Sequence, residues 1–250
     1  SLSIMNDPGW TKKSEVKRYT ANVNALYHIS KALSLNLISN ASYRKQKAPG
    51  TLSSSVDPVS GEVKRDFDIN PYSYALNTSR TLDPDAYYVR NYAPFNILHE
   101  LDNNYIDLNV TDLKFQGELK WKPIHKIELS ALGAYKTSMT TQSHTIKDYS
   151  NQAWAFRAMD DATMRQANPW LYTDPENANT LPVSVLPVGG FYRETKYSMD
   201  SYDFRGTASY NDVYNENHIF NFFGGMEINA VNRQRTWSVS YTHLTLPTIA

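Results

Sequence analysis

The sequence predicts an all-β fold of about six antiparallel strands, arranged as three up-and-down hairpins. Apolar residues occupy every second position from Leu113 to Trp121 and again, after a short turn, from Ile127 to Tyr135. Successive side chains of a strand point to opposite faces, so each strand has one apolar and one polar face. The connections between hairpins run to about 50 to 60 residues, whereas ordinary loops have about 4 to 6. Short turns at one end and long loops at the other predict a fragment of a transmembrane β-barrel.

The composition fits strands with a single apolar face. Hydrophobic residues make up 41% of the 250 residues, at the low end for globular proteins. The chain has 18 Tyr and five Trp against nine Phe, and rings with a polar edge are enriched where a protein meets a membrane interface. Soluble glycan-binding sandwiches are also rich in Tyr and Trp, so composition leaves open a soluble extracellular all-β carbohydrate-binding module.

Charge and cysteine content exclude several classes. The 25 basic and 25 acidic residues cancel without forming a basic stripe, so we expect no nucleic-acid partner. The absence of Cys excludes disulfides, thiol catalysis and Cys-ligated metals. The sequence has no apolar run of about 18 residues, as a transmembrane helix would need. The first residues lack the features of a signal peptide, so we expect the chain to be a fragment.

The first hairpin is predicted from about Arg18 to Lys45, with its turn at Ser30–Ala32. Its polar face carries mainly Asn and Ser, which suit a hydrated lumen. The following segment, Gln46–Tyr105, contains prolines at positions 49, 58, 71, 84 and 94, which exclude a run of central strands. We therefore predict a long extracellular loop that can hold short strands.

The second hairpin is predicted from about Leu108 to Thr145, with its turn at Lys122–His125. Pro123 lies in that turn, where no ladder donor is needed. A second extracellular loop follows from Ile146 to Thr195, and within it Asp160–Gln166 is predicted to form one or two helical turns.

The third hairpin pairs Tyr202–Tyr210 with Phe220–Ile228 across the turn Asp212–Glu216. At about 3.3 Å per residue, strands of about 13 to 17 residues span roughly 43 to 56 Å, more than an apolar band of about 25 Å. We therefore expect strands that project beyond the membrane and one open, curved sheet with unpaired outer edges. A sandwich would instead cover Leu113, Leu119, Leu129 and Phe222 with a second sheet.

The last residues do not continue this pattern. The string VSYTHLTLPTI, Val239–Ile249, looks like the translation of a transposon-based sequencing adapter; the alternative is a genuine strand and turn ending at Pro247. We assign residues 1–238 to a partial barrel domain and 239–250 to a non-native tail. Such a tail is expected to bury no side chains.

Several strings resemble one known family. They are NDPG at Asn6–Gly9, RYTANVNALYHISKALSLNLISNASY at Arg18–Tyr43, NPYSYALN at Asn70–Asn77 and RNYAPFNILHELDNN at Arg90–Asn104. They resemble the SusC/RagA family of TonB-linked (TonB-dependent) outer-membrane transporters of Bacteroidetes, over about Asp7–Trp237. In the last string Ile97 replaces the family's usual Pro.

The resemblance implies a cell outer membrane protein whose complete barrel has about 22 strands around a plugged lumen. It also implies import of oligosaccharides or peptides, a surface SusD-like lipoprotein as lid, and energy from TonB through a plug and an N-terminal segment absent from this chain. The other expected partners are the outer-membrane lipids.

Catalytic chemistry is not indicated by the sequence. The histidines at 28, 99, 125, 144, 218 and 243 have no metal-site spacing, and we interpret them as isolated strand and turn residues. The carboxylates at 160, 161, 174 and 176 are not held at a glycosidase spacing, so a surface glycosidase ranks last. We therefore assign no catalytic, cofactor-binding or metal-binding residue and expect no enzyme.

The candidate substrate-binding residues are aromatic and lie in the two predicted loops. They are Tyr87, Tyr88, Tyr92, Trp154, Trp170 and Tyr172. In a transporter mouth such rings would stack on sugars or grip peptide side chains. The alternative is that these rings, with Phe95 and Phe156, pack the loops together and offset their loss of conformational entropy.

Overall fold

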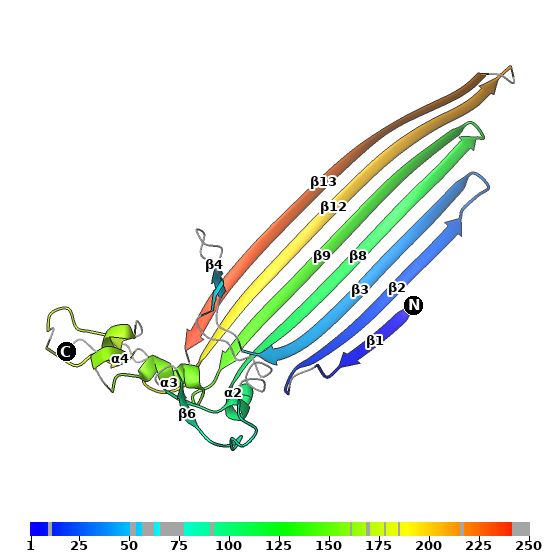
Figure 1. Ribbon diagram of the computed structural model, residues 1–250. Helices are drawn as coiled ribbons and strands as arrows, with labels where there is room; N and C mark the ends of the chain where they lie inside the picture. The colour runs from blue at the N-terminus through cyan, green and yellow to red at the C-terminus, as the bar shows by residue number, and fades with distance from the viewer. Residues whose placement is uncertain are drawn as a thin grey trace.

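The main feature of the computed structural model is one open antiparallel sheet of seven strands (Figure 1). The structure describes residues 1–9, 12–50, 54–56, 63–65, 78–90, 93–160, 162–168, 171–177, 179–184, 186–215 and 218–241. The strand order is β1-β2-β3-β8-β9-β12-β13, so each strand of the sheet pairs with its neighbours along the chain. The predicted all-β, up-and-down architecture is confirmed.

Apart from β1, the strands of the sheet are long, and the loops that flank them carry the helices of the described residues. They are β1 (Leu2–Asp7), β2 (Glu15–His28), β3 (Leu33–Pro49), β8 (Asn104–Ile124), β9 (Ile127–Ile146), β12 (Phe191–Tyr214) and β13 (His218–Tyr241). The first loop holds β4 (Ser54–Val56), β5 (Val63–Arg65), β6 (Tyr88–Arg90), β7 (Ala93–Phe95) and α2 (Ile97–Asn103). The second holds α3 (Asn151–Arg157), α4 (Ala162–Ala167), β10 (Leu171–Tyr172) and β11 (Val183–Ser184).

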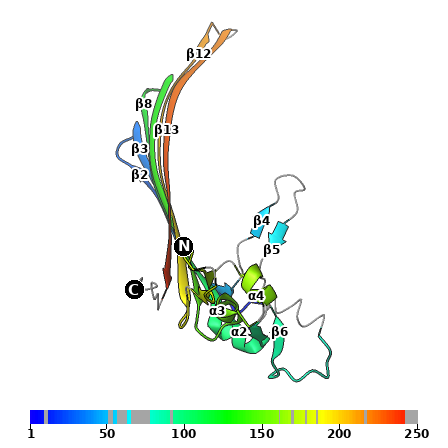
Figure 2. The same ribbon diagram turned by 90° about the vertical axis from the view of Figure 1, so that its left-hand side faces the viewer.

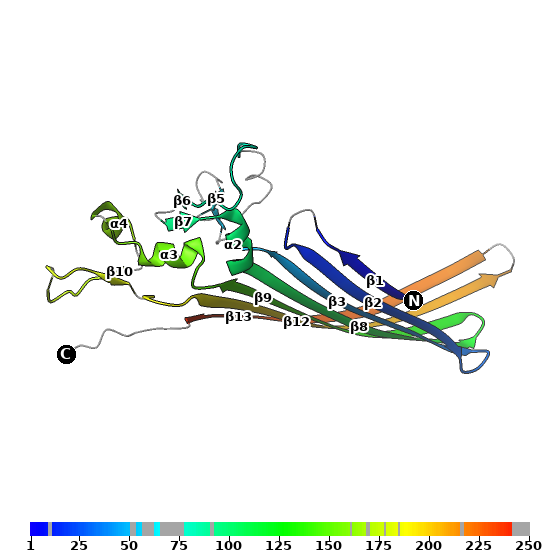
Figure 3. The same cartoon turned by 90° about the horizontal axis from the view of Figure 1, so that it is seen from below.

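The short turns and the long loops lie at opposite ends of the sheet. Figure 1 and Figure 3 place the β2–β3, β8–β9 and β12–β13 turns at one end and the helices at the other. Figure 2 shows that the helices and short strands lie on one side of the sheet. The predicted asymmetry of turns and loops is therefore confirmed.

The structure corrects the predicted strand number and length. β1 adds a seventh strand, because Leu2 and Ile4 align with Ala21 and Tyr19 of β2. The strands reach 24 residues in β12 and β13, since backbone pairing continues where the apolar alternation ends. The predicted helical turns at Asp160–Gln166 correspond to α4. The sequence did not predict α2 and α3, which have seven residues each, too few to reveal a helical period.

The buried residues lie under the loops rather than between two sheets. One cluster consists of Phe95, Ile97 and Leu101 with Leu98. The other consists of Ile146, Ala153, Phe156, Leu186 and Phe191 with Tyr241. In the described part of the chain, the apolar face of the large sheet is not covered: Phe222 is 64% exposed. The sandwich alternative therefore receives no support.

The beginning of the predicted tail is integrated into the sheet. Val239 to Tyr241 pair with Arg193 to Phe191, and the ring of Tyr241 lies 5.9 Å from that of Phe191. The expectation that the tail buries no side chain is wrong for Tyr241, because its side chain is partly buried against the cluster that contains Phe191. Residues 242–250 lie outside the described residues, and the adapter origin of the tail stays a prediction.

Candidate functional site

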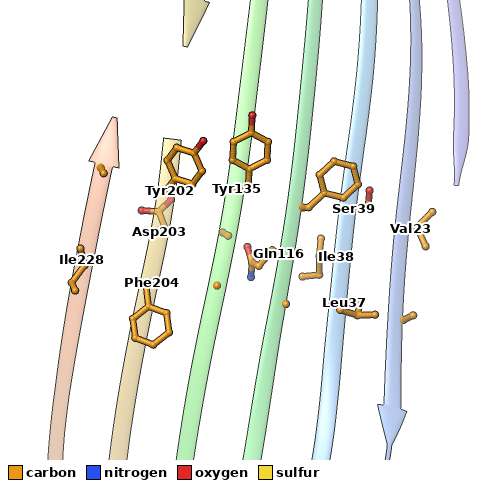
Figure 4. Close-up of a pocket in the computed structure, with 16 residues that line it drawn as sticks. Val23, Leu37, Ile38, Ser39, Gln116, Tyr135, Tyr202, Asp203, Phe204 and Ile228 are labelled. Carbon is orange, nitrogen blue, oxygen red and sulfur yellow. The ribbon is translucent and has the colours of Figure 1, made fainter. Parts of the chain in front are cut away.

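One face of the sheet carries an apolar band that crosses its strands. Leu113 to Trp121 of β8, Ile127 to Tyr135 of β9 and Tyr202 to Tyr210 of β12 each place five residues on this face, of which the middle or fourth is a glycine. Figure 4 shows Val23 and Leu37 on the neighbouring strands β2 and β3, and Phe204 and Ile228 on the neighbouring strands β12 and β13, with β8 and β9 between the two pairs. Each run has nine residues, and a transmembrane strand needs about 9 to 11. The band therefore has the height of a lipid-facing surface.

Aromatic residues border the apolar band along both edges. Toward the loops the ring pairs are Tyr19 with Tyr43, at 6.4 Å, and Tyr135 with Tyr202, at 5.0 Å. Toward the turns, the aromatic residues are Tyr27, Trp121, Tyr210 and Phe222, and the last two lie 6.3 Å apart. Two such girdles flank the apolar zone of transmembrane barrels. The members of each pair lie on neighbouring strands and are distant along the chain, so the pairing register brings them together.

Beyond the loop-side girdle, the two long loops are joined by a buried carboxylate. Glu100 of α2 is 1% exposed. Its Oε2 accepts a hydrogen bond from the backbone N–H of Asn151 at 2.8 Å, and its Oε1 accepts one from Nδ2 of Asn104 at 3.2 Å. Asn151 is the first residue of α3, so a residue of the first loop satisfies a free N–H of a helix in the second. Burial raises the pKa of the Glu100 carboxyl, and the bond from Asn151 opposes that rise.

Asn104 extends this hydrogen-bond network to the sheet. Its Nδ2 also donates to Oε1 of Gln152 at 3.3 Å, and its Oδ1 lies 2.6 Å from Nε2 of His144 in β9. Gly50 passes against the same side chain: a Cβ added there would lie 1.8 Å from Oδ1 of Asn104. Only glycine allows this approach. The loops are thus fixed to the outer ends of β3, β8 and β9.

Two asparagines organise the backbone around this network. Asn96 caps α2, where its Oδ1 accepts from the N–H of His99 at 3.0 Å while its Nδ2 donates to the carbonyls of Pro84 and Ala86. Nδ2 of Asn151 donates to the carbonyls at positions 90, 93 and 94 of the β6–β7 hairpin. Its Oδ1 is buried with no hydrogen-bond partner among the described residues. We call the assembly of α2, α3 and this hairpin the loop cap.

The loop cap carries a partly exposed group of rings, which we call the aromatic cluster. It consists of Tyr87, His99, Tyr149 and Trp154. The His99 ring stacks on the Trp154 ring, with the ring centres 6.3 Å apart and an angle of 11° between the ring planes. The centre of the Tyr87 ring lies 5.9 Å from that of His99. Tyr149 meets Trp154 edge-on, and its carbonyl lies 3.0 Å from Nε2 of His99. Tyr87 and Tyr149 are 53% and 62% exposed. The cluster therefore presents exposed ring faces and edges that come from both loops.

The structure separates the candidate residues predicted from sequence. Tyr87 and Trp154 belong to the aromatic cluster, whereas Tyr88 packs on the buried Phe95 at 5.3 Å, as the loop-packing alternative expects. Tyr172 lies in β10 and takes no part in the cluster. Tyr92 and Trp170 lie outside the described residues.

Sequence reasoning missed His99 and Tyr149. The interpretation of the histidines as strand and turn residues is wrong for His99, which lies in helix α2. The only local signal for that helix was Asn96 with Glu100 four residues later, an N-cap followed by an acidic residue. No signal at Tyr149 indicated its place beside Trp154. None of the helices among the described residues has the length and apolar run needed to cross a membrane.

These features define the class of the protein: an all-β protein whose open, up-and-down antiparallel sheet fits a fragment of a β-barrel, with a loop cap at one end. No family model matches the sequence, and no curated protein matches it. Among solved structures, the chain is similar to a chain in the structure of the RagAB peptide transporter, with a TM-score of 0.51 and 16% sequence identity. The similarity covers 91% of this chain and 25% of that chain, so this chain spans about a quarter of it. At this identity the similarity concerns the fold alone.

Proposed function

We propose that this chain forms part of the barrel wall of an outer-membrane active transporter of the SusC/RagA type, which imports oligosaccharides or peptides. The observation that carries the proposal is the nine-residue apolar band whose two ends form aromatic girdles, on a sheet whose other face is mainly polar. Such a surface is stable against lipid on one side and water on the other. The fold similarity to a chain of a peptide transporter supports the same class.

In the proposed mechanism the loop cap captures the nutrient and the polar face guides it inward. Rings of the aromatic cluster stack on sugar rings or on apolar side chains of a peptide. A SusD-like lipoprotein closes over the loops, and TonB supplies energy through a plug and N-terminal segment outside this chain. The nutrient undergoes no covalent change, so the proposal includes no enzyme activity and no cofactor.

The soluble carbohydrate-binding module remains the second candidate from sequence, but the apolar band counts against it. A soluble sheet of this size would leave Val23, Phe115 and Phe204 facing water, and soluble monomers rarely expose such a large apolar patch. In the described part of the chain no second sheet covers them. A membrane covers them without any further domain.

Deletion of the second loop tests the proposed function. In the complete transporter, replacing residues 148–189 by a short Gly-Ser linker is expected to abolish uptake of the cognate nutrient, because α3 and half of the aromatic cluster are lost. The barrel should stay in the outer membrane, since loop tips tolerate change. The measurements are uptake by whole cells and heat-modifiable migration of the extracted protein. The same linker inserted at Lys31, in a turn at the other end, serves as control. Uptake at the normal rate after the deletion would show that this loop carries neither ligand nor lid contacts.

A single substitution tests the aromatic cluster. Trp154→Ala removes the ring that stacks on His99 and is expected to weaken nutrient binding by up to about tenfold, as aromatic pairs contribute about 0.5 to 1.5 kcal/mol. The measurement is the concentration that gives half-maximal uptake. Tyr172→Ala, in the same loop but outside the cluster, should leave it unchanged. Equal effects of the two substitutions would contradict a specific role for the cluster.

A further inference from the structure

We propose that the polar face of the sheet, between the loop-side girdle and the loop cap, is a binding site for carboxylate groups of the imported nutrient. We call this region the basic wall. The inference rests on the proposed function, because it assigns a chemical class to the nutrient. It is drawn from the distribution of charges that the strand register creates.

The basic wall contains seven cations and two carboxylates. The cations are Arg18, Arg44, Lys114, Lys136, Arg193, Arg233 and Arg235, and the acids are Asp7 and Asp112. Both acids already accept hydrogen bonds: Asp7 from the N–H of Gly9 and Asp112 from the hydroxyl of Ser138. Among the described residues, none of the seven cations forms a salt bridge. The basic wall therefore has an uncompensated positive charge.

The same face is neutralised nearer the turns. There the cations Lys120, Lys122 and Arg205 each have an acidic partner, at 3.4, 2.8 and 3.0 Å. The opposite face of the sheet, beside the basic wall, is balanced. It carries Lys17, Lys45, Lys47 and Lys196 against Glu15, Asp107, Glu194 and Asp200. The excess charge is therefore specific to one face and one level, which composition does not explain.

Within the basic wall, like charges lie directly opposite each other on neighbouring strands. Lys114 is in register with Lys136, and Arg18 is in register with Arg44. Such pairs destabilise a sheet. Nε of Arg44 is also buried without a hydrogen-bond partner among the described residues. A local rule broken in this way, with no acidic partner among the described residues, is typical of a site that an external anion completes.

The basic wall contains a groove with two guanidinium groups. The groove has a volume of about 270 Å³ and is lined by Ser138, Thr140, Tyr197, Met199, Arg233 and Arg235. Arg235 lies over the ring of Tyr197 at 5.4 Å, which leaves its N–H edges available for an acceptor. Guanidinium groups bind carboxylates through two parallel hydrogen bonds. Hydroxyls beside them suit the neutral part of a sugar or a peptide.

The position of the basic wall favours a nutrient over a lipid as its ligand. Anionic lipid headgroups would meet the opposite, apolar face above its girdle, and that face is electrically balanced. The basic wall lies on the face that the loop cap covers, because Asn104, His144 and Phe191 project from it into the cap. The carboxylates of peptides and of uronic acid sugars are the anionic groups that the proposed nutrients carry.

The test measures equilibrium binding to the complete transporter with two matched pairs of probes. One pair is acetylated pentaglutamate and acetylated pentaglutamine, and the other is trigalacturonate and its methyl ester. The expected result is preference for the acidic member of one pair, which identifies the source of the carboxylate, and weaker binding at higher salt. R233Q/R235Q and K114Q/K136Q should each weaken that binding at least about tenfold. K120Q, in the neutralised part of the same face, should not.

Three results would overturn the inference. The first is equal binding of the acidic and neutral members, or no binding of either acidic probe. The second is an acidic preference that both double variants retain, which would place carboxylate recognition elsewhere. The third is that the variants lose barrel stability but keep the preference for the acidic probe. That result would show that the basic wall pairs with another part of the protein. In each case, loss of uptake after the second-loop deletion would leave the proposed function intact.

Discussion

Replacing Ala131 by Arg is expected to destabilise the folded protein in a lipid bilayer by about 2 to 4 kcal/mol, the cost of a cation on the lipid face near the bilayer centre. Ala131 is exposed on β9 inside the apolar band, opposite Leu119 of β8 and Gly206 of β12. An arginine there has no acidic neighbour on the same face and must lie in hydrocarbon. The measurement is urea-induced unfolding of the complete protein in vesicles.

Ala134 provides a matched control on the same strand. It lies three residues away on the polar face, level with Gln116 and Asp203. Ala134→Arg adds the same side chain beside a carboxylate in a hydrated lumen. We expect the free energy of unfolding to change by no more than about 0.5 kcal/mol, as for ordinary surface substitutions. A larger effect at Ala134 than at Ala131 would reverse the assignment of the two faces.

Replacing Glu100 by Gln is expected to loosen the contact between the two long loops. One of the two acceptor oxygens becomes an amide that faces a donor, either the N–H of Asn151 or Nδ2 of Asn104. Losing a hydrogen bond to a charged group costs about 1.5 to 3 kcal/mol, which corresponds to about 10- to 150-fold faster exchange of the α3 amides if they exchange by local opening. The measurement is hydrogen exchange of the peptide that contains α3. Glu176→Gln, an exposed carboxyl in the same loop, should leave exchange unchanged.

The stability of the loop cap should also depend on pH through Glu100. Burial raises the pKa of this carboxyl in the folded cap, so the closed form holds its proton more tightly than the open form. The contribution of Glu100 to cap stability is therefore largest below the ordinary pKa of a glutamate. It falls as the pH rises from that value to the raised pKa, and it is constant above. The wild type should lose protection of α3 across this window relative to Glu100→Gln, which has no titrating group there. A constant ratio of protection would contradict the raised pKa.

The sequence determined the two faces of the sheet because the strand period is local. Apolar alternation from Leu113 to Trp121 and from Ile127 to Tyr135 predicted which side chains share a face, and the structure confirms that they do. The short turns were equally readable, since a few polar or turn-forming residues interrupt the alternation. These signals also predicted the pairing of Tyr202–Tyr210 with Phe220–Ile228. Strand ends were misplaced because backbone hydrogen bonding does not require apolar residues.

The loop cap could not be derived from sequence. α2 and α3 have seven residues each, and Glu100 contacts a residue 51 positions away. Which partner closes a loop of that length depends on packing, not on neighbouring residues. Aromatic residues at 87 and 154 were recognised as candidates, but their meeting at His99 needed both loops in place.

The sequence by itself therefore determined the fold class, the apolar face and the presence of three short turns, all of which follow from patterns within a few residues. Two of the turns lie two to three residues further along the chain than predicted, because β8 continues to Ile124 and β12 to Tyr214. Only the tertiary structure decided the girdle pairs, the Glu100 network and the charge of the basic wall. The equal totals of acidic and basic residues led us to expect no basic stripe. Strand register nevertheless placed Lys114 opposite Lys136 and Arg18 opposite Arg44 on one face. Register decides which residues of neighbouring strands lie side by side, so it can gather like charges that are distant along the chain.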